Sequence, residues 1–514
     1  AIDATQQKAT VTAHQVNVSV AVQLADLVKS TLGPYGMDKE MVDGAGKVVL
    51  TNDGATIFKE TKLNHPTATI ITEIARTQEQ NCFDGTTSCV VINGELMKEA
   101  STLTKMNVHP TRIAKGFNLA NNKAQELLEN IAIPTDKDIL SKVAKTAMTG
   151  KSVESDDESL ADICVEVANS TTLDNISIVR RPNGKISESV AIAGILVDRE
   201  RVHLNMPSKV KDAKIALIDV DITLPEFAQT IQVQVTDNEA VKEFIESRKS
   251  QLQEIATQII DSGANVVLCL RDIDRFVSEY FAKQGIYAAR RVAKSDLEAV
   301  SKATGGRIVS SIDELDEADL GTSGLLEEIT VGEKPIIKLT ENPTSEAVSV
   351  LLRAPTQHVV DEVARAFEDA LGVVSIAIED EKVLAGGGAP YLYLSKELKE
   401  YANSVGGREQ MAVVAFANAL EVIPSALAEN SGLDPLDTLI ALRQLHTSGS
   451  VGIFGVDVEE GGGKDMVEAG VIEPLRVVSQ ALQSASNVSS QLLRIDNIIE
   501  MNRGPEIGED GFDY

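Results

Sequence analysis

The chain contains no tryptophan, and aromatic residues make up only 4% of its 514 residues. So few aromatic rings argue against a protein that stacks nucleic-acid bases on aromatic platforms. Basic residues are also scarce: 48 Lys and Arg stand against 77 Asp and Glu, which gives a net charge of −29. Nucleic acids and anionic membranes are polyanions and would be repelled by such a charge. We therefore expect neither nucleic acid nor a membrane as a partner.

Cysteine, histidine and long apolar runs are scarce as well. The four cysteines include no CxxC pair, and the six histidines form neither HxxxH nor HExxH. Neither a zinc site nor a disulfide framework is therefore expected. No apolar run approaches the ~20 residues that a membrane-spanning helix needs, and the first residues lack signal-peptide character. These features predict a cytoplasmic protein with reduced thiols.

The length predicts two to four domains, and the apolar periodicity changes along the chain. Residues 90–170 have a mostly helical pattern. From about residue 176 short β-like runs alternate with helical patterns, among them an alternating run at 231–235, and we interpret 205–346 as an inserted α/β domain. One short helix there has an apolar face formed by Ile273, Phe276, Val277, Tyr280 and Phe281. Core packing would explain that face equally well.

The stretch with the most chemical content is Asp84-Gly85-Thr86-Thr87-Ser88, which precedes a helical pattern through Cys89, Ile92 and Leu96. Asp84 is a good N-cap residue, and the free N–H groups of the first turn suit a phosphate. A carboxylate beside phosphate-binding N–H groups is also where Mg²⁺ would bind. An ordinary capped helix uses the same residue types, so this motif alone does not decide between the two.

Other glycine-containing turns end regular elements elsewhere in the chain: Leu32-Gly33-Pro34-Tyr35-Gly36, Asp53-Gly54 and Gly386-Gly387-Gly388. They match neither the GxxxxGK[ST] P-loop nor GxGxxG after a strand, so a nucleotide site here would be of another kind. Lys151 follows a hydroxyl-rich turn. It is either a solvated turn residue or a point charge for a γ-phosphate.

Several longer motifs occur in a fixed order. They are TLGPYGMDK at 31–39, TNDGAT at 51–56, DGTTS at 84–88, GGGAP at 386–390 and GVIEP at 470–474. The set resembles the group II chaperonins, most closely the archaeal thermosome, and the resemblance covers nearly the whole chain.

The resemblance implies a multidomain α+β architecture. A mainly helical equatorial ATP-binding domain would comprise 1–134 and 384–514, and a small intermediate hinge domain 135–204 and 347–383. The apical domain, 205–346, would be α/β with a helical protrusion that acts as a built-in lid. Identical or homologous subunits would form a double ring of eight or nine per ring that encloses unfolded protein clients.

The resemblance also implies roles for individual residues. Asp53 and Asp369 would position and activate the attacking water, and Asp84 would hold Mg²⁺, with K⁺ as a further candidate ion. The residues that would bind ATP or ADP are Leu32, Gly33, Pro34, Asp53, Gly54, Gly85, Thr86, Thr87, Ser88, Lys151, Gly387 and Glu473. The apolar helix face at 273–281 would contact clients.

The chain departs from the family pattern at three places. Phe83 stands where glycine is usual before Asp-Gly-Thr-Thr. If the backbone at this position needs a special φ, a phenylalanine there is strained. Tyr35 stands where lysine is common, and Tyr391 where glutamate is frequent. The prediction is an ATP-driven folding ring. The alternatives are a ring that holds clients without hydrolysing ATP and, less favoured, a soluble metabolic ATPase or kinase.

Overall fold

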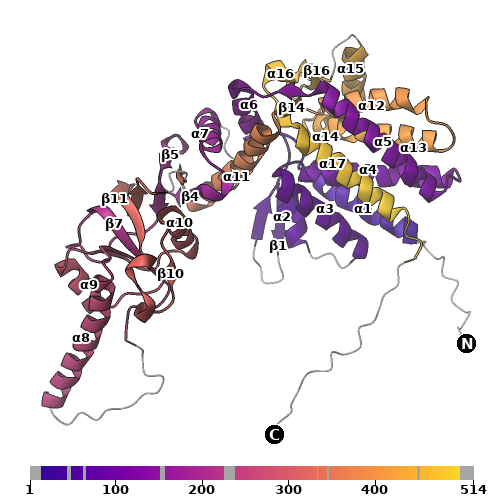
Figure 1. The fold of residues 1–514 in the computed structure, drawn as a ribbon. Coiled ribbons are helices and arrows are strands. Elements are labelled where there is room, and N and C mark those ends of the chain that lie inside the picture. The colour runs from indigo at the N-terminus through magenta and orange to yellow at the C-terminus, as the bar shows by residue number, and fades with distance from the viewer. Residues whose placement is uncertain are drawn as a thin grey trace, which may run out of the picture. The chain divides into compact units, whose positions relative to one another are not determined.

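The computed structural model describes residues 13–42, 48–61, 65–150, 157–224, 238–332, 334–343, 347–447 and 452–497. The chain divides into two compact units, which are described separately (Figure 1). The first unit combines the two ends of the chain, 1–150 and 372–514, and the second is the continuous segment 151–371. The alternating run predicted as a strand at 231–235 lies outside the described residues.

The N-terminal segment of the first unit is mainly helical. Its elements are α1 (Ala13–Lys29), β1 (Lys39–Val42), β2 (Val48–Thr51), α2 (Gly54–Glu60), α3 (Pro66–Cys82), α4 (Thr86–Lys105), α5 (Pro110–Ile131), β3 (Ile133–Pro134) and α6 (Lys137–Met148). Strands β1 and β2 pair in antiparallel orientation.

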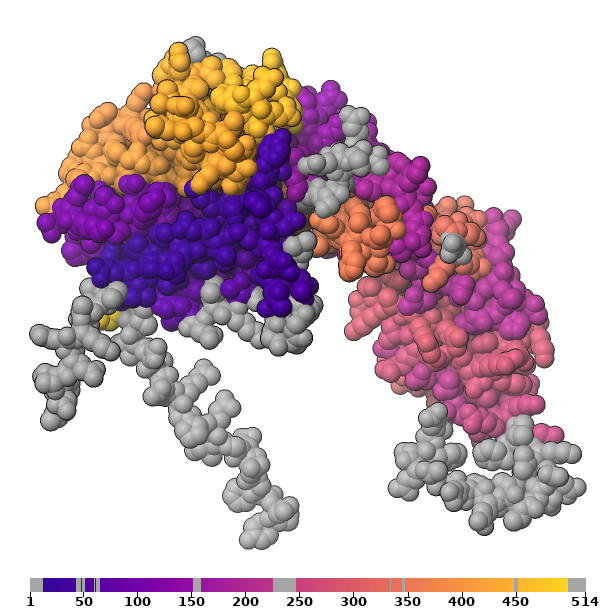
Figure 2. Space-filling view, turned by 180° about the vertical axis from the view of Figure 1, so that it is seen from behind, coloured from indigo at the N-terminus to yellow at the C-terminus, as the bar shows by residue number. Residues whose placement is uncertain are grey.

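The C-terminal segment completes this unit. Its elements are the end of α11 (Gln357–Asp380), β14 (Lys382–Ala385), α12 (Ala389–Ala402), α13 (Glu409–Leu420), α14 (Val422–Asn430), α15 (Pro435–Thr447), β15 (Phe454–Val456), β16 (Gly463–Asp465), α16 (Met466–Ala469), β17 (Ile472–Pro474) and α17 (Leu475–Leu492). In Figure 2 this segment, in orange and yellow, lies directly on the indigo and purple N-terminal segment. Three short antiparallel strands, in the order β17-β14-β3, join the two segments.

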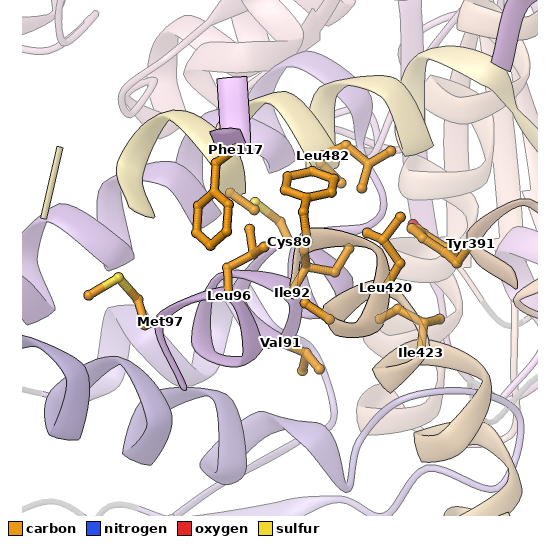
Figure 3. Packing of buried hydrophobic residues seen from close by; sticks show 14 of the residues in the cluster. Cys89, Val91, Ile92, Leu96, Met97, Phe117, Tyr391, Leu420, Ile423 and Leu482 are labelled. Atoms are coloured by element: carbon orange, nitrogen blue, oxygen red, sulfur yellow. The ribbon is translucent and has the colours of Figure 1, made fainter. Parts of the chain in front are cut away.

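Helix α4 forms the centre of the first unit's core. Between Cys89 and Met97 its sequence is apolar on most sides, as expected where other helices surround it, and its residues from Cys89 to Ile92 are all buried. Figure 3 shows side chains of α4 packed with Phe117 of α5, Leu420 of α13 and Leu482 of α17. The Phe117 ring also meets Phe416 edge-on, with centroids 5.8 Å apart. The core therefore needs both ends of the chain.

One apolar stretch corrects a prediction. Among the described residues, 409–430 is long and apolar enough to cross a membrane by length and composition, with a mean hydropathy of 1.7, so the prediction that no run approaches this length is wrong. The stretch comprises α13 and α14, and 67% of the apolar window is buried inside the protein. A core helix produces such a composition without any membrane.

The second unit is built on two sheets. Its helices and strands are α7 (Asp157–Ser170), β4 (Ile176–Arg181), β5 (Val190–Ala193), β6 (Ile195–Val197), β7 (Lys209–Ile218), α8 (Asn238–Asp261), β8 (Val266–Cys269), α9 (Arg275–Lys283), β9 (Tyr287–Ala289), α10 (Lys294–Thr304), β10 (Ile308–Val309), β11 (Gly321–Val331), β12 (Lys334–Thr340), β13 (Val348–Arg353) and most of α11. The larger sheet has the order β6-β12-β11-β7-β8-β9, with β10 beside β7, and the smaller has the order β4-β13-β5.

Helices cover both faces of the larger sheet. Strands β7, β8 and β9 are parallel and are connected through α8 and α9. Because successive strand residues point to opposite faces, Val267 and Cys269 pack with α8 and α9, whereas Val266 and Leu268 pack with α10. This arrangement is the α/β unit that the alternating sequence pattern predicts.

Candidate functional site

Asp53 caps helix α2. Its two carboxylate oxygens accept the backbone N–H groups of Ala55 at 3.2 Å and Thr56 at 2.8 Å. Its own N–H donates to Oγ1 of Thr51 at 3.1 Å. Bonds on both sides of the residue fix the orientation of the carboxylate, and the side chain remains partly exposed.

The N-terminus of helix α4 is left open. The sequence predicts Asp84 as its N-cap, and this is wrong: the N-cap is Gly85, in the left-handed region with φ +79°. The chain therefore enters the helix one residue later than expected, and Asp84 Oδ1 accepts the N–H of Gly85 at 2.7 Å. Gly85 has no side chain with which to cap the first turn. An exposed carboxylate thus lies beside N–H groups that favour an anion.

The last turn of α3 holds this loop from behind. Gln78 is fully buried, and its Nε2 donates to the carbonyl oxygens of Asp84 at 2.9 Å and Val477 at 3.1 Å. Thr86 Oγ1 donates to a carboxylate oxygen of Glu79 at 2.9 Å. Neither residue belongs to the motifs that predict the site from the sequence. A usable signal exists for Gln78, because it is a polar residue on the apolar stripe of α3.

The N-termini of α2 and α4 are neighbours. A Cβ atom built on Gly54 would lie 2.9 Å from Oγ1 of Thr87 and 3.4 Å from Cγ2 of Thr86. The structure therefore brings together two motifs, Asp53-Gly54 and Thr86-Thr87, that are more than thirty positions apart in the sequence.

Helix α12 contributes a third N-terminus. Its N-cap is Gly388, again in the left-handed region and again without a capping side chain. In its first turn Tyr391 is only 3% exposed, and its phenol lies close to the side chain of Ser88 in the first turn of α4. Burial raises the pKa of Tyr391 well above its ordinary value, and the carboxylates of Glu473 and Asp84 add to the rise. The phenol therefore stays protonated.

Glu473 is held by the short sheet at the junction of the two segments. It lies in β17 opposite Leu384 of β14. Burial, and secondarily the negative charge of Asp84, raise the pKa of Glu473 to about 8. Gly387 follows β14, and its carbonyl oxygen accepts the N–H of Val456 at 2.9 Å. Glu473, Tyr391, Asp84 and Ser88 thus belong to one electrostatic neighbourhood.

The turn at Gly33-Pro34 lies beside the end of the N-terminal segment. A Cβ atom built on Gly150 would lie 3.2 Å from Cα of Pro34, and Asn52 Nδ2 donates to the carbonyl oxygen of Gly150 at 3.0 Å. Asn430 fixes the same turn, since its Nδ2 donates to the carbonyl oxygen of Leu32 at 2.8 Å. Lys151, the next predicted residue, lies outside the described residues.

Two sets of predicted residues belong to the second unit. Asp369 is partly buried on α11, three residues before the first unit resumes at Gly372. In and beside α9, Ile273, Val277 and Phe281 are buried in the core under the sheet, so in this conformation they are unable to contact a client. For these three residues the core explanation is correct. Phe276 and Tyr280 are partly exposed and remain candidates.

The residues of the first unit fit a magnesium–nucleotide complex. The open N-termini of α4 and α12 come close to each other at Ser88 and Tyr391, and the exposed Asp84 carboxylate adjoins the first of them. The part of the chain that the structure describes contains no cluster of three or more His, Cys, Asp or Glu side chains that could hold a metal ion by themselves. A single carboxylate suits Mg²⁺ only when phosphate oxygens complete its coordination.

Comparison with known proteins identifies the class to which this fold and site belong. Residues 24–503 match the TCP-1/cpn60 chaperonin family, and the chain belongs to that family. Within it the chain is a thermosome-like subunit of the group II chaperonins, as its sequence motifs indicate. The multidomain α+β fold predicted from those motifs is confirmed.

The relatives match along nearly their full length. A thermosome subunit beta from Methanothermobacter thermautotrophicus is 46% identical over 494 residues, which cover 95% of this chain and 91% of the relative. A thermosome subunit from Methanocaldococcus jannaschii is 45% identical over 98% of this chain and 95% of its own length. The solved open-state monomer of a group II chaperonin from Methanococcoides burtonii is 42% identical, with a TM-score of 0.66, and the match covers 80% of this chain and all of that one.

Proposed function

We propose that this chain is the subunit of a ring-shaped chaperonin that binds and hydrolyses Mg-ATP to fold unfolded proteins. The observation that carries the proposal is the open N-terminus of α4, flanked by the Asp84 carboxylate and by Asp53 at the adjoining start of α2. Resemblance to the thermosome adds the assembly: a double ring of identical or homologous subunits, eight or nine in each, in the cytoplasm. The domain boundaries predicted from the sequence belong to the same proposal.

Different residues of the chain would bind different parts of the nucleotide. The first-turn N–H groups of α4, with Thr86, Thr87 and Ser88, would bind phosphate oxygens. Gly33, Pro34, Gly387 and Glu473 would border the rest of ATP or ADP. When bound, Mg²⁺ would supply positive charge that compensates the phosphates at Asp84.

Hydrolysis would depend on two further carboxylates. Asp53, held by its two backbone hydrogen bonds, and Asp369 would orient a water molecule and accept its proton. Lys151 would contact the γ-phosphate as a point charge. Because Asp369 belongs to the unit that the sequence inserts between the two halves of the site, its approach would couple hydrolysis to a conformational change.

The test is the ATPase activity of assembled particles, with negative-stain images of the same samples. Wild type is expected to hydrolyse ATP only with Mg²⁺, and Asp369→Ala is expected to lose at least about 100-fold in kcat with rings intact. Glu368→Ala is the matched control: Glu368 is the adjacent residue on α11, and its ion pair with Arg180 is exposed. Equal losses in both variants would contradict a catalytic role for Asp369.

One observation favours a second candidate function, a ring that holds clients without hydrolysing ATP. Phe83, directly before Asp84, has φ +57°, a strained conformation for a bulky residue. Wild-type rings that bind unfolded protein but release no phosphate would select this alternative.

A further inference from the structure

The ring of Phe83 lies against helix α11 at Gly372. A Cβ atom built on Gly372 would overlap the Phe83 ring at Cγ, Cδ1 and Cδ2, so only glycine at this position admits the ring. Phe83 also packs against a small buried cluster of Cys82, Ile376 and Val477. The ring therefore joins three helices, α3, α11 and α17, directly beside the Asp84 loop.

The backbone of Phe83 is held in an unfavourable conformation. It is the C-cap of α3 in the left-handed region, with φ +57° and ψ 2°, and its N–H donates to the carbonyl oxygen of Glu79 at 2.9 Å. For a residue with a Cβ atom this conformation is strained. Glycine would avoid the strain but would leave the surface at Gly372 empty. The packing of the ring offsets the strain.

The same stretch of α11 is fixed at a second point. Arg476 of α17 pairs with Asp380, with 2.7 Å between Nε and Oδ2, and its Nη2 lies 3.0 Å from a carboxylate oxygen of Glu379. Residues 372–380 are thus held at one end by an apolar contact and at the other by an ion pair. Phe83, which directly precedes Asp84 in the chain, makes the apolar contact at the first of these two points.

We propose that Phe83 is a positioning residue for ATP hydrolysis, because its ring, seated on Gly372, fixes the Asp84 loop to α11, the helix that also carries Asp369. The inference rests on the proposed function. Because the ring packs on Gly372 and on the cluster of Cys82, Ile376 and Val477, nucleotide affinity is expected to stay nearly unchanged. What changes is the geometry of the hydrolytic step, where small displacements are costly.

A double-mutant cycle tests this inference on assembled, full-length particles. Gly372→Ala is expected to displace the ring and lower kcat about tenfold, with KM for ATP within about twofold of wild type. Phe83→Gly removes both the ring and the strain, and is expected to lower kcat to a similar extent without lowering the unfolding temperature. Once the ring is absent, the added Cβ has room, so Gly372→Ala is expected to have no further effect in the Phe83→Gly background.

Controls separate positioning from a general structural effect. Gly406→Ala introduces the same methyl group where nothing lies within 4 Å, and is expected to behave as wild type. Equal effects of Gly372→Ala in both backgrounds would overturn the inference, as would an unchanged kcat in Phe83→Gly. If Gly372→Ala fails to assemble, Phe83→Gly alone decides through kcat, KM and unfolding temperature. Wild-type particles without Mg-dependent hydrolysis would instead refute the proposed function.

Discussion

At the scale of single residues, two acidic side chains of the candidate site, Asp84 and Glu473, lie in different environments. The carboxylate of Asp84 is exposed and accepts the N–H of Gly85, whereas Glu473 lies partly buried in a sheet. The two carboxylates repel each other, and the buried one has the raised pKa, of about 8. Near neutral pH Glu473 therefore carries its proton for much of the time.

This raised pKa predicts how stability depends on pH in the absence of Mg²⁺ and nucleotide. The folded protein holds the Glu473 proton up to about pH 8, whereas the unfolded chain releases it near pH 4.5. The contribution of this group to stability is therefore complete below pH 4.5 and is lost as the pH rises through about 8. Glu473→Gln is expected to flatten that part of the dependence of unfolding temperature on pH.

Glu468→Gln provides the control, because Glu468 is exposed in the same part of the chain. Thermal unfolding in a chelator across this pH range is the measurement. A Glu473→Gln variant whose stability falls with pH as steeply as that of wild type would show that another group is responsible.

Residue-level prediction succeeds where a local rule applies. Phe83 breaks the family pattern, and the structure gives it the positive φ that the sequence analysis anticipated for a strained residue. Gln78 was missed because its role depends on where its amide points, which periodicity does not encode. Likewise, Tyr391 and Ser88 lie close together in the site but are about 300 positions apart in the sequence.

At the scale of elements, helix termini determine the chemistry of the site. At the start of α2, Asp53 is both the N-cap of the helix and a proposed catalytic carboxylate. Substitutions that keep or remove the capping group are expected to distinguish the two roles. Asn is as good an N-cap as Asp, but its single amide oxygen can replace only one of the two carboxylate acceptors. Asp53→Asn is therefore expected to lose one backbone hydrogen bond and keep most of the unfolding free energy, while kcat falls about 100-fold. Asp53→Ala loses both backbone hydrogen bonds and is expected to cost about 1 kcal/mol in addition.

Chemical denaturation and phosphate release on the same preparations provide the two readouts. If Asp53→Asn retained full activity, the carboxylate would be a cap and nothing more.

For α4 the informative position is Gly85. Gly85→Ala is expected to destabilise the protein by more than the strain of a positive φ, because the new Cβ would lie 2.8 Å from Cγ1 of Val477 and 2.9 Å from Nε2 of Gln78. Gly432 is a matched control, since it has φ +75° and nothing within 4 Å, so that Gly432→Ala adds strain alone, about 1–2 kcal/mol. Thermal unfolding and nucleotide binding compare the two variants.

The expected result is a larger loss of stability in Gly85→Ala, accompanied by weaker ATP binding. Weaker binding is not expected in Gly432→Ala. Equal effects of the two substitutions would mean that the approach of Gln78 and Val477 to this loop is unimportant.

Element-level prediction was good for periodic segments and poor for what happens at their ends. The alternation of strands and helices in the second unit is predictable, because alternation and continuous apolar runs are local signals. The start of α4 was misplaced by one residue, because Asp84 and Gly85 are both acceptable N-caps and only the left-handed turn decides between them. The apolar face of α9 is ambiguous from the sequence, because a face that packs in the core and a face that binds a client give the same periodicity.

At the scale of the whole molecule, the sequence predicted a helical unit with an inserted α/β unit. The assembly it would form consists of copies that each carry a net charge of −29. Like charges repel, and salt screens them, with a Debye length of about 10 Å at 0.1 M. We therefore expect assembly to become tighter when the ionic strength is raised from about 0.02 M to about 0.2 M.

Sedimentation at several protein concentrations measures this effect, with sucrose in place of salt as a control for non-ionic solute. Particles that dissociate as salt is added would instead indicate that ion pairs between subunits dominate the assembly.

The pairing of β14 with β17 has a consequence for synthesis of the protein. Leu384 and Glu473 face each other in that pair, and much of the core around α4 comes from residues after 384. On the ribosome, where chains fold as they emerge, the segment 151–371 is complete while the first 150 residues still lack their partners. The first turn of α4 would then remain incompletely packed until α12, β17 and α17 have been synthesised. A nascent chain would thus become able to bind nucleotide only at the end of its synthesis.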